Sequence, residues 1–243
     1  MRRIQGYLGR RDILKIVGMG GVGLAAATAG GVLWNGQGVD RQAAKAQPKP
    51  QPVSPDAAFQ RLMEGNKRFV QGQRKYPDQA RSRLQETAAG QYPFATILTC
   101  ADSRVPAEIV FDQGIGDIFV VRVAGNVVNP EVIGSLEYAT SVVGAQLLMI
   151  MGHERCGAVT EAVKGSVLPA NIATFVNDVK PAIERVKNKP GDLIDNTVVA
   201  NVQMQIELLK QKSTIVTQLI QQGKLKLVGA RYDLDTGEVT IVA

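Results

Sequence analysis

Two short segments of this 243-residue chain hold every cysteine and histidine in its sequence. One is the run C-A-D-S-R, which begins at Cys100, and the other is H-E-R-C-G, which begins at His153 and includes Cys156. Two thiolates and one imidazole suit zinc, and catalytic zinc sites use three protein ligands and leave a fourth position for water. Any metal site that needs soft ligands must therefore use Cys100, His153 and Cys156.

The elements around these segments predict that the two segments meet in space. Three short apolar runs have the character of buried strands: 94–99, 117–123 and 146–151. The apolar spacing within 129–143 is that of a helix. Near-continuous apolar strands that alternate with helices indicate an α/β fold with a mostly parallel central sheet flanked by helices. Because the carboxyl ends of parallel strands share one edge of a sheet, Cys100 and His153 are expected close together.

The flanking segments complete this picture. Ser54 and Pro55 are a helix cap and first-turn pair, and they begin an amphipathic N-terminal helical arm that runs to about residue 70. A second polar helix is predicted over 78–89. Helices follow Cys156 as far as residue 223, including a long polar one near 198–210, and Cys156 is expected at a helix start, where the dipole favours its thiolate. Residues 225–232 and 238–242 predict a terminal strand pair.

The formal charge of +6 lies almost entirely in the first segment of the chain. Residues 1–46 hold seven Lys and Arg against two Asp, a charge of +5, so 47–243 carry only +1. No Lys or Arg run interleaved with aromatic residues follows. We therefore expect no nucleic-acid partner for the folded part of the chain.

Residues 1–46 are predicted to be an export signal. Arg10 and Arg11 precede Asp12 and an apolar stretch over 16–33, and the order of charged, apolar and polar segments is that of a secretory signal. The run R-R-D-I-L-K resembles the twin-arginine export motif. This predicts a twin-arginine export machinery as partner and a location in a periplasm, or a thylakoid lumen in a photosynthetic cell. The small-x-small run 44–46 is a candidate cleavage site, and an uncleaved signal would anchor the protein to the membrane.

A nucleotide-binding turn is the competing interpretation of the same segment. Residues 18–23 match G-x-G-x-x-G after a strand-like run. A βαβ unit needs a second strand after its helix, whereas this chain enters the proline-rich stretch 47–54. Prolines lack the N–H that a ladder requires, so 47–54 is predicted to be an extended linker. The domain division is then 1–46 signal, 47–54 linker and 55–243 zinc-dependent α/β domain.

A Cys100–Cys156 disulfide is the alternative use of the two cysteines, and it would leave a non-catalytic exported domain. Three observations favour zinc. The only histidine precedes Cys156 by three residues, and both cysteines end or follow predicted strands at one sheet edge. Twin-arginine export, in addition, delivers proteins that are already folded and loaded with cofactor.

The spacing of C-x-D-S-R and H-x-x-C-G resembles that of the β-class carbonic anhydrases. The likeness extends over about 55–242 and includes L-M-E-G-N-K-R-F-V from Leu62 and L-K-L-V-G-A-R-Y-D-L-D-T-G-E-V-T-I from Leu225. It implies reversible hydration of carbon dioxide to bicarbonate and a proton by zinc-bound hydroxide. It also implies one Zn²⁺ per chain, held by Cys100, His153 and Cys156.

The same resemblance assigns Asp102 and Arg104 as a pair beside the metal. In the family's active form Arg104 holds the Asp102 carboxylate off the zinc, where it accepts a hydrogen bond from the zinc-bound water. In a closed form of some members, Asp102 becomes the fourth ligand. Val123 departs from the commoner pattern, which has Asn in the R-N-x-G-N stretch, and this is expected to alter the wall near Asn126 without abolishing activity.

Three further residues take their expected role from the plant-type members of the family. Gln91, Phe119 and Tyr138 occupy the positions that line the carbon dioxide pocket there. The family's smallest working unit is a homodimer in which the neighbour completes the pocket wall, so a homodimer or a higher multiple is expected.

Two questions about the chemistry follow from the same residues. Hydrolysis of carbon disulfide or carbonyl sulfide uses the same fold and ligands, and it is the alternative activity. The only histidine is a zinc ligand, so proton exit is expected to depend on external buffer, with Tyr138, Asp102 or ordered water as internal carriers.

Overall fold

The computed structural model describes residues 52–243. The predicted export signal over 1–46 and most of the predicted linker over 47–54 lie outside the described residues. Within 52–243, none of the helices combines the length and apolar character needed to cross a membrane.

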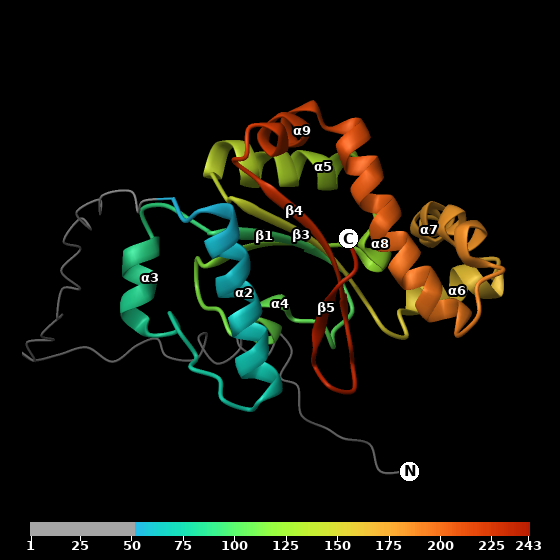
Figure 1. Cartoon of the computed structure of the whole chain (residues 1–243), viewed down its shortest axis with the longest axis horizontal. Coiled ribbons are helices and arrows are strands. Elements are labelled where there is room, and N and C mark those ends of the chain that lie inside the picture. The colour runs from blue at the N-terminus through green and yellow to red at the C-terminus, as the bar shows by residue number, and fades with distance from the viewer. Residues whose placement is uncertain (1–51) are drawn as a thin grey trace, which may run out of the picture. The chain divides into compact units, whose positions relative to one another are not determined.

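A single five-stranded sheet organises the described residues (Figure 1). Its strands are β1 (Ala95–Thr99), β2 (Ile118–Arg122), β3 (Leu147–His153), β4 (Lys226–Tyr232) and β5 (Val239–Ile241). They lie in the order β2-β1-β3-β4-β5, with the first four parallel and β5 antiparallel to β4. This confirms the predicted α/β fold with a mostly parallel sheet. The prediction rests on near-continuous apolar strands, which need cover on both faces of a sheet.

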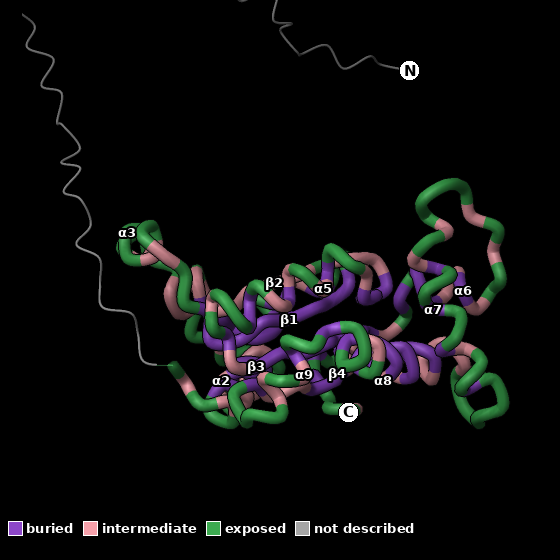
Figure 2. Tube along the Cα trace, turned by 90° about the horizontal axis from the view of Figure 1, so that it is seen from above, coloured by how far each residue is buried: buried purple, intermediate pink, exposed green. Residues whose placement is uncertain are grey.

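Helices cover both faces of the sheet. They are α2 (Pro55–Val70), α3 (Arg81–Thr87), α4 (Ala107–Val110), α5 (Pro130–Glu137), α6 (Gly157–Lys164), α7 (Ile172–Val186), α8 (Leu193–Lys212) and α9 (Thr214–Gln221), with a 3₁₀ turn η1 (Ala124–Asn126) and a π-helical turn η2 (Tyr138–Val143). Ile97 packs in a core with α2 and α4, whereas Leu98 packs in a core with α5, α8 and α9. Successive residues of a strand point to opposite faces, which explains this division. Figure 2 shows the buried positions running through β1 and β3.

The helix cap that the sequence predicts at Ser54 forms in the structure. The Ser54 side chain accepts a hydrogen bond from the Ala57 N–H, and Pro55 occupies the first turn of α2. The second helix is shorter than the predicted 78–89, because α3 begins only at Arg81. Asp78 has a φ of 52°, a left-handed conformation that a right-handed helix cannot contain.

The predicted polar helix near 198–210 is α8, and the structure corrects its description. Nine of its residues are buried, including the polar Asn201 and Gln205. Two strand glycines allow this close packing: a Cβ at Gly152 or at Gly229 would lie 2.9 or 2.8 Å from a methyl group of Val202. Asn201 and Gln205 therefore lie inside the protein, and the periodicity of the sequence does not reveal this.

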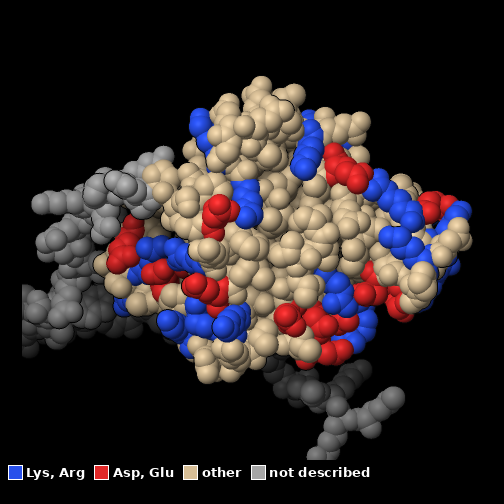
Figure 3. All heavy atoms as spheres, in the orientation of Figure 1, with Lys and Arg blue, Asp and Glu red and all other residues tan. Residues whose placement is uncertain are grey.

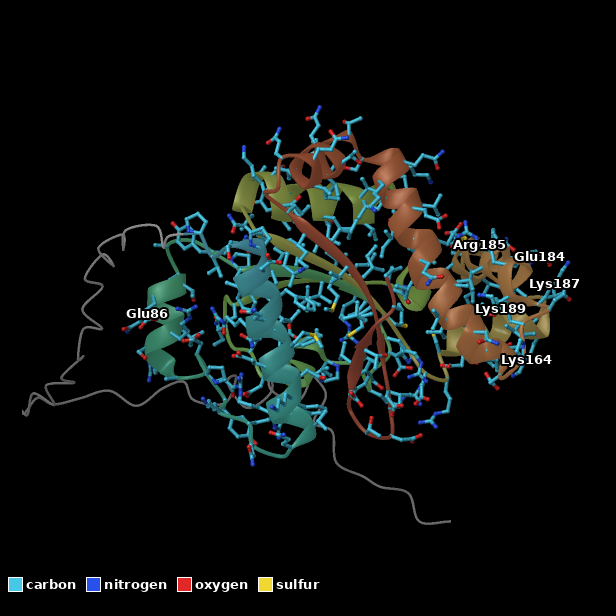
Figure 4. All side chains as sticks on the ribbon, in the orientation of Figure 1. Glu86, Lys164, Glu184, Arg185, Lys187 and Lys189 are labelled. Atoms are coloured by element: carbon cyan, nitrogen blue, oxygen red, sulfur yellow. The ribbon has the colours of Figure 1, made fainter. Side chains whose placement is uncertain are left out.

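Charges are distributed over the surface in mixed sign. On the face seen in Figure 3, lysines and arginines are interspersed with acidic residues. Figure 4 labels side chains at the periphery of α6 and α7, among them Arg185 and Lys187. These two pair with Glu207 and Glu184 at 2.8 and 2.6 Å. Exposed pairs of this kind contribute at most about 1 kcal/mol each, so the fold rests on its buried hydrophobic clusters.

Candidate metal centre

The sheet brings the two chemistry-bearing segments to one edge, as predicted. Cys100 follows the last residue of β1 and His153 is the last residue of β3. These strands are parallel neighbours, with Thr99 paired to Met151, so both residues leave the sheet at its carboxyl end. Cys156 precedes α6 as its N-terminal cap, which confirms its predicted place at a helix start.

The geometry of the three side chains fits a tetrahedral metal ion. One ligand atom from each of Cys100, His153 and Cys156 lies within 4.8 Å of the others, and all three residues are buried. The two sulfur atoms are 4.0 Å apart. Two sulfurs each about 2.3 Å from a tetrahedral zinc are about 3.8 Å apart, so zinc needs almost no rearrangement. A disulfide would require about 2.05 Å, and both cysteines are free thiols.

His153 presents one nitrogen to the centre of this group. Its Nδ1 is 2.8 Å from the carbonyl oxygen of Glu154 and donates to it, which leaves Nε2 as an acceptor. Nε2 is buried and has no hydrogen-bond partner among residues 52–243. An unpaired buried polar atom costs about 1–3 kcal/mol, and ligation of a metal would satisfy it. This orphaned nitrogen beside two sulfurs is the clearest sign that the site is built for a cation.

The two thiols lie within hydrogen-bonding distance of each other, and each shifts the pKa of the other. The hydrogen bond with Cys156 lowers the pKa of Cys100, despite burial that raises it. The same contact with Cys100, together with burial, raises the pKa of Cys156. The Gly125 N–H also donates to the Cys100 sulfur, at 3.4 Å. Binding of a divalent metal would displace the protons that the two thiols hold, because both sulfurs ligate as thiolates.

Asp102 and Arg104 form the predicted pair beside the ligands. The Nε and Nη2 of Arg104 donate to the two carboxylate oxygens of Asp102 at 2.9 and 2.7 Å. Side-chain hydrogen bonds from Arg104 lower the pKa of Asp102 to about 2. The Asp102 Oδ2 is 3.7 Å from the His153 Nε2. An ionised carboxylate is thus held next to the position that a metal would occupy.

Sequence reasoning missed two residues that shape this loop. The Nε and Nη2 of Arg122 donate to the carbonyl oxygens of Cys100 and Asp102 at 3.0 and 2.5 Å. Gly125 supplies the N–H on the Cys100 sulfur. A charged residue at the end of an apolar strand was the available signal for Arg122, because a cation there can hold the carbonyls of the neighbouring loop.

The three expected pocket residues do not join the ligands within one chain. Phe119 pairs with Thr96, four residues before Cys100, which places it about 13 Å back along the strand direction. The rings of Phe119 and Tyr138 are 6.3 Å apart. Gln91 and Tyr138 line one open hollow of the surface. Their role at a carbon dioxide pocket stays a prediction that requires a second chain.

Known proteins resemble this chain over most of the described residues. A family model described as Carbonic anhydrase matches residues 95–239. Carbonic anhydrase 2 of Mycobacterium tuberculosis is 39% identical over 193 residues, which cover 78% of this chain and 93% of that protein.

Solved structures show the same fold. The structure of the β-carbonic anhydrase CcaA is 25% identical with a TM-score of 0.61, and the match covers 75% of this chain and 94% of that one. A tetrameric β-carbonic anhydrase from Sordaria macrospora shares the fold with a TM-score of 0.60 at 19% identity, covering 76% of this chain and 96% of that one.

Proposed function

The chain belongs to the β-class carbonic anhydrase family, and on that premise we propose that it hydrates carbon dioxide reversibly at a zinc ion held by Cys100, His153 and Cys156. The observation that carries the metal site is the buried, unpartnered His153 Nε2 beside two free sulfurs at tetrahedral spacing. Zinc held by these residues would act as a Lewis acid that lowers the pKa of a bound water to about 7 and so would supply the nucleophile.

Asp102 and Arg104 orient that nucleophile. With its pKa lowered to about 2, the Asp102 carboxylate is ionised and an acceptor at neutral pH. It accepts a hydrogen bond from the attacking water and aims the oxygen lone pair at the carbon of carbon dioxide. Arg104 keeps the carboxylate from turning toward the ligands, because both carboxylate oxygens are committed to its guanidinium. A turn of Asp102 onto the metal as fourth ligand would close the site.

Proton release uses groups other than histidine. The His153 Nε2 is committed to the metal and its Nδ1 donates to a carbonyl oxygen. The proton therefore leaves through Tyr138 or ordered water to external buffer. Asp102, the third carrier expected from the sequence, would hold a proton only transiently, because Arg104 lowers its pKa to about 2. Turnover should depend on buffer concentration, and undiminished turnover in a non-buffering medium would contradict this route.

A homodimer or a higher multiple completes the site. β2 is an edge strand whose residues are half-buried or exposed, and exposed Tyr138 lies beside it. An edge of this kind is a template for pairing with another chain. Gln91, Phe119 and Tyr138 of one chain would then line the carbon dioxide pocket of the other in the plant-type arrangement. The tetrameric state of the fold relative from Sordaria macrospora accords with this.

Export through the twin-arginine machinery to a periplasm or thylakoid lumen is part of the same proposal. The match to the Mycobacterium tuberculosis protein leaves about a fifth of this chain uncovered. The twin-arginine run lies within 1–46, ahead of the residues 95–239 that the family model matches. Fractionation of cells that express the full chain tests the location, and substitution of Arg10 and Arg11 by Lys should retain the protein in the cytoplasm.

Stopped-flow hydration of carbon dioxide, run beside metal analysis, tests the activity. The zinc-loaded protein should hydrate carbon dioxide, and Cys156→Ser should lose both zinc and activity. Thr160→Ser is the matched control, because serine keeps the hydrogen bond that Thr160 donates to the Cys156 carbonyl. Full activity of Cys156→Ser without zinc would overturn the proposal. Turnover of carbonyl sulfide in place of carbon dioxide would assign the same site to the alternative hydrolysis.

A further inference from the structure

Two buried amide side chains of α8 connect this helix to the loop beside Cys100. Asn201 and Gln205 are each 1% exposed. The Nδ2 of Asn201 donates to the Gly125 carbonyl oxygen at 2.9 Å, and the Nε2 of Gln205 donates to the Asn201 Oδ1 at 3.0 Å. The Oε1 of Gln205 accepts from the Val128 N–H at 2.8 Å. These bonds form a continuous chain that holds both ends of the segment 125–128.

The chain of bonds holds a segment with a left-handed backbone. Gly125 has a φ of 71° and Asn126 has a φ of 45°, both in the left-handed region. Glycine adopts that conformation freely and asparagine more readily than most residues, so local sequence permits it and the contacts around it select it. A Cβ on Gly125 would lie 3.3 Å from the Ala158 Cβ of α6. The loop is therefore fixed between α8 and the helix that follows Cys156.

The result of this conformation is a hydrogen bond to a proposed metal ligand. The Gly125 N–H donates to the Cys100 sulfur while the Gly125 carbonyl is held by Asn201. Gly125 is thus held through both of its backbone polar groups, the N–H and the carbonyl. α8 also contacts the strand that ends in His153, since a Cβ on Gly152 would lie 2.9 Å from Val202. One helix therefore sets the position of both segments that carry the ligands.

We propose that Asn201 and Gln205 are positioning residues of the metal centre: they hold the Gly125 N–H on the Cys100 sulfur, which fixes the direction and the donor strength of that ligand. The inference rests on the proposed zinc site. A hydrogen bond to a ligating sulfur withdraws electron density from it, and a fixed sulfur binds without rearrangement. Second-layer hydrogen bonds of this type typically change metal affinity by about 10–100-fold.

Isosteric variants test this in the full-length protein. Asn201→Leu and Gln205→Met remove the chain of bonds, and Gln203→Met is the matched control on the same helix, because the Gln203 amide bonds the Val242 carbonyl oxygen instead. Zn²⁺ affinity is measured by competition with a chelator, and Co²⁺ loading reports the sulfur-to-metal charge-transfer band. We expect affinity to fall about 10–100-fold and the band to shift to lower energy in the first two variants only.

Equal affinity and an unshifted band in Asn201→Leu and Gln205→Met would overturn the inference, even if both variants melt earlier. Failure of the unsubstituted protein to bind Zn²⁺ or Co²⁺ would instead overturn the proposed function. If the variants do not fold, the unsubstituted protein loaded with the NMR-active isotope of cadmium decides the question. A scalar coupling between the metal and the Gly125 amide proton supports the hydrogen bond, and its absence refutes it.

Discussion

Substitution of Gly152 by alanine tests whether α8 positions the metal centre through close packing. Gly152 precedes His153 in β3, and an added Cβ would lie 2.9 Å from the Val202 Cγ2 and 3.0 Å from the Val198 Cγ1. Ordinary contact between such carbons begins near 3.4 Å. α8 or β3 must therefore shift by about half an ångström, since Val202 and Val198 are both buried and cannot turn into solvent.

The expected change in stability is the sum of two opposing effects. Alanine restricts the unfolded chain more than glycine does, which stabilises by about 0.5–1 kcal/mol where the native site accepts it. Overpacking a full core costs about 1–3 kcal/mol. We expect Gly152→Ala to lower the free energy of unfolding by about 1–2 kcal/mol. At about 2–4 °C per kcal/mol for this size, Tm should fall by about 2–8 °C.

Urea and thermal unfolding measure the effect, and chelator competition measures zinc affinity, which should fall because His153 moves. Gly134→Ala is the control: its Cβ would meet nothing within 4 Å in α5, so it should stabilise by about 0.5–1 kcal/mol. Adding Val202→Ala should relieve Gly152→Ala, with a coupling of at least about 0.5 kcal/mol. A Gly152→Ala protein as stable as Gly134→Ala, or strict additivity with Val202→Ala, would refute the argument.

Three further outcomes follow from the site and the fold. Arg104→Met should raise the pKa of Asp102 from about 2 toward its ordinary value and lower kcat/KM about 10–100-fold by stopped flow; unchanged kcat/KM would contradict the pairing. Burial raises the pKa of Asp112, but two backbone N–H groups and Arg68 outweigh it and keep that pKa lowered. Because the pKa of Asp112 is lower in the folded chain than in the unfolded chain, where it is near 3.9, the ionised carboxylate stabilises the fold above that pH. This stabilisation is lost as the pH falls through the folded pKa. Asp112→Asn should therefore lower the free energy of unfolding by about 2 kcal/mol at pH 7, less than the loss of a fully buried pair because Arg68 is partly exposed. In urea unfolding, the difference in stability from the unsubstituted protein should narrow below about pH 4. A difference that is constant with pH would argue against this role of Asp112. Zinc at a thousand times its Kd should stabilise the folded protein by about 4 kcal/mol. Removal of the zinc by a chelator should therefore lower Tm by about 8–16 °C. An unchanged Tm would count against the metal site.

Local patterns in the sequence were enough to predict the strands, the first helix and the set of metal ligands. Apolar runs predicted the strands because a parallel strand covered on both faces needs apolar residues throughout. The Ser54 and Pro55 cap predicted the start of α2 because its chemistry is contained within a few residues. Cys100, His153 and Cys156 could be named because the chain has no other soft ligands and because parallel strands end at one edge.

Tertiary structure alone decided what surrounds those ligands. Asn201 and Gln205 give α8 a polar sequence, yet they are buried, since their partners come from a loop more than seventy residues earlier. The Gly125 hydrogen bond to Cys100 depends on a left-handed backbone at residues 125 and 126, which glycine and asparagine permit but do not require. Such contacts join segments that are distant in sequence, and their existence depends on the distance between packed elements, which a local pattern of residues does not contain.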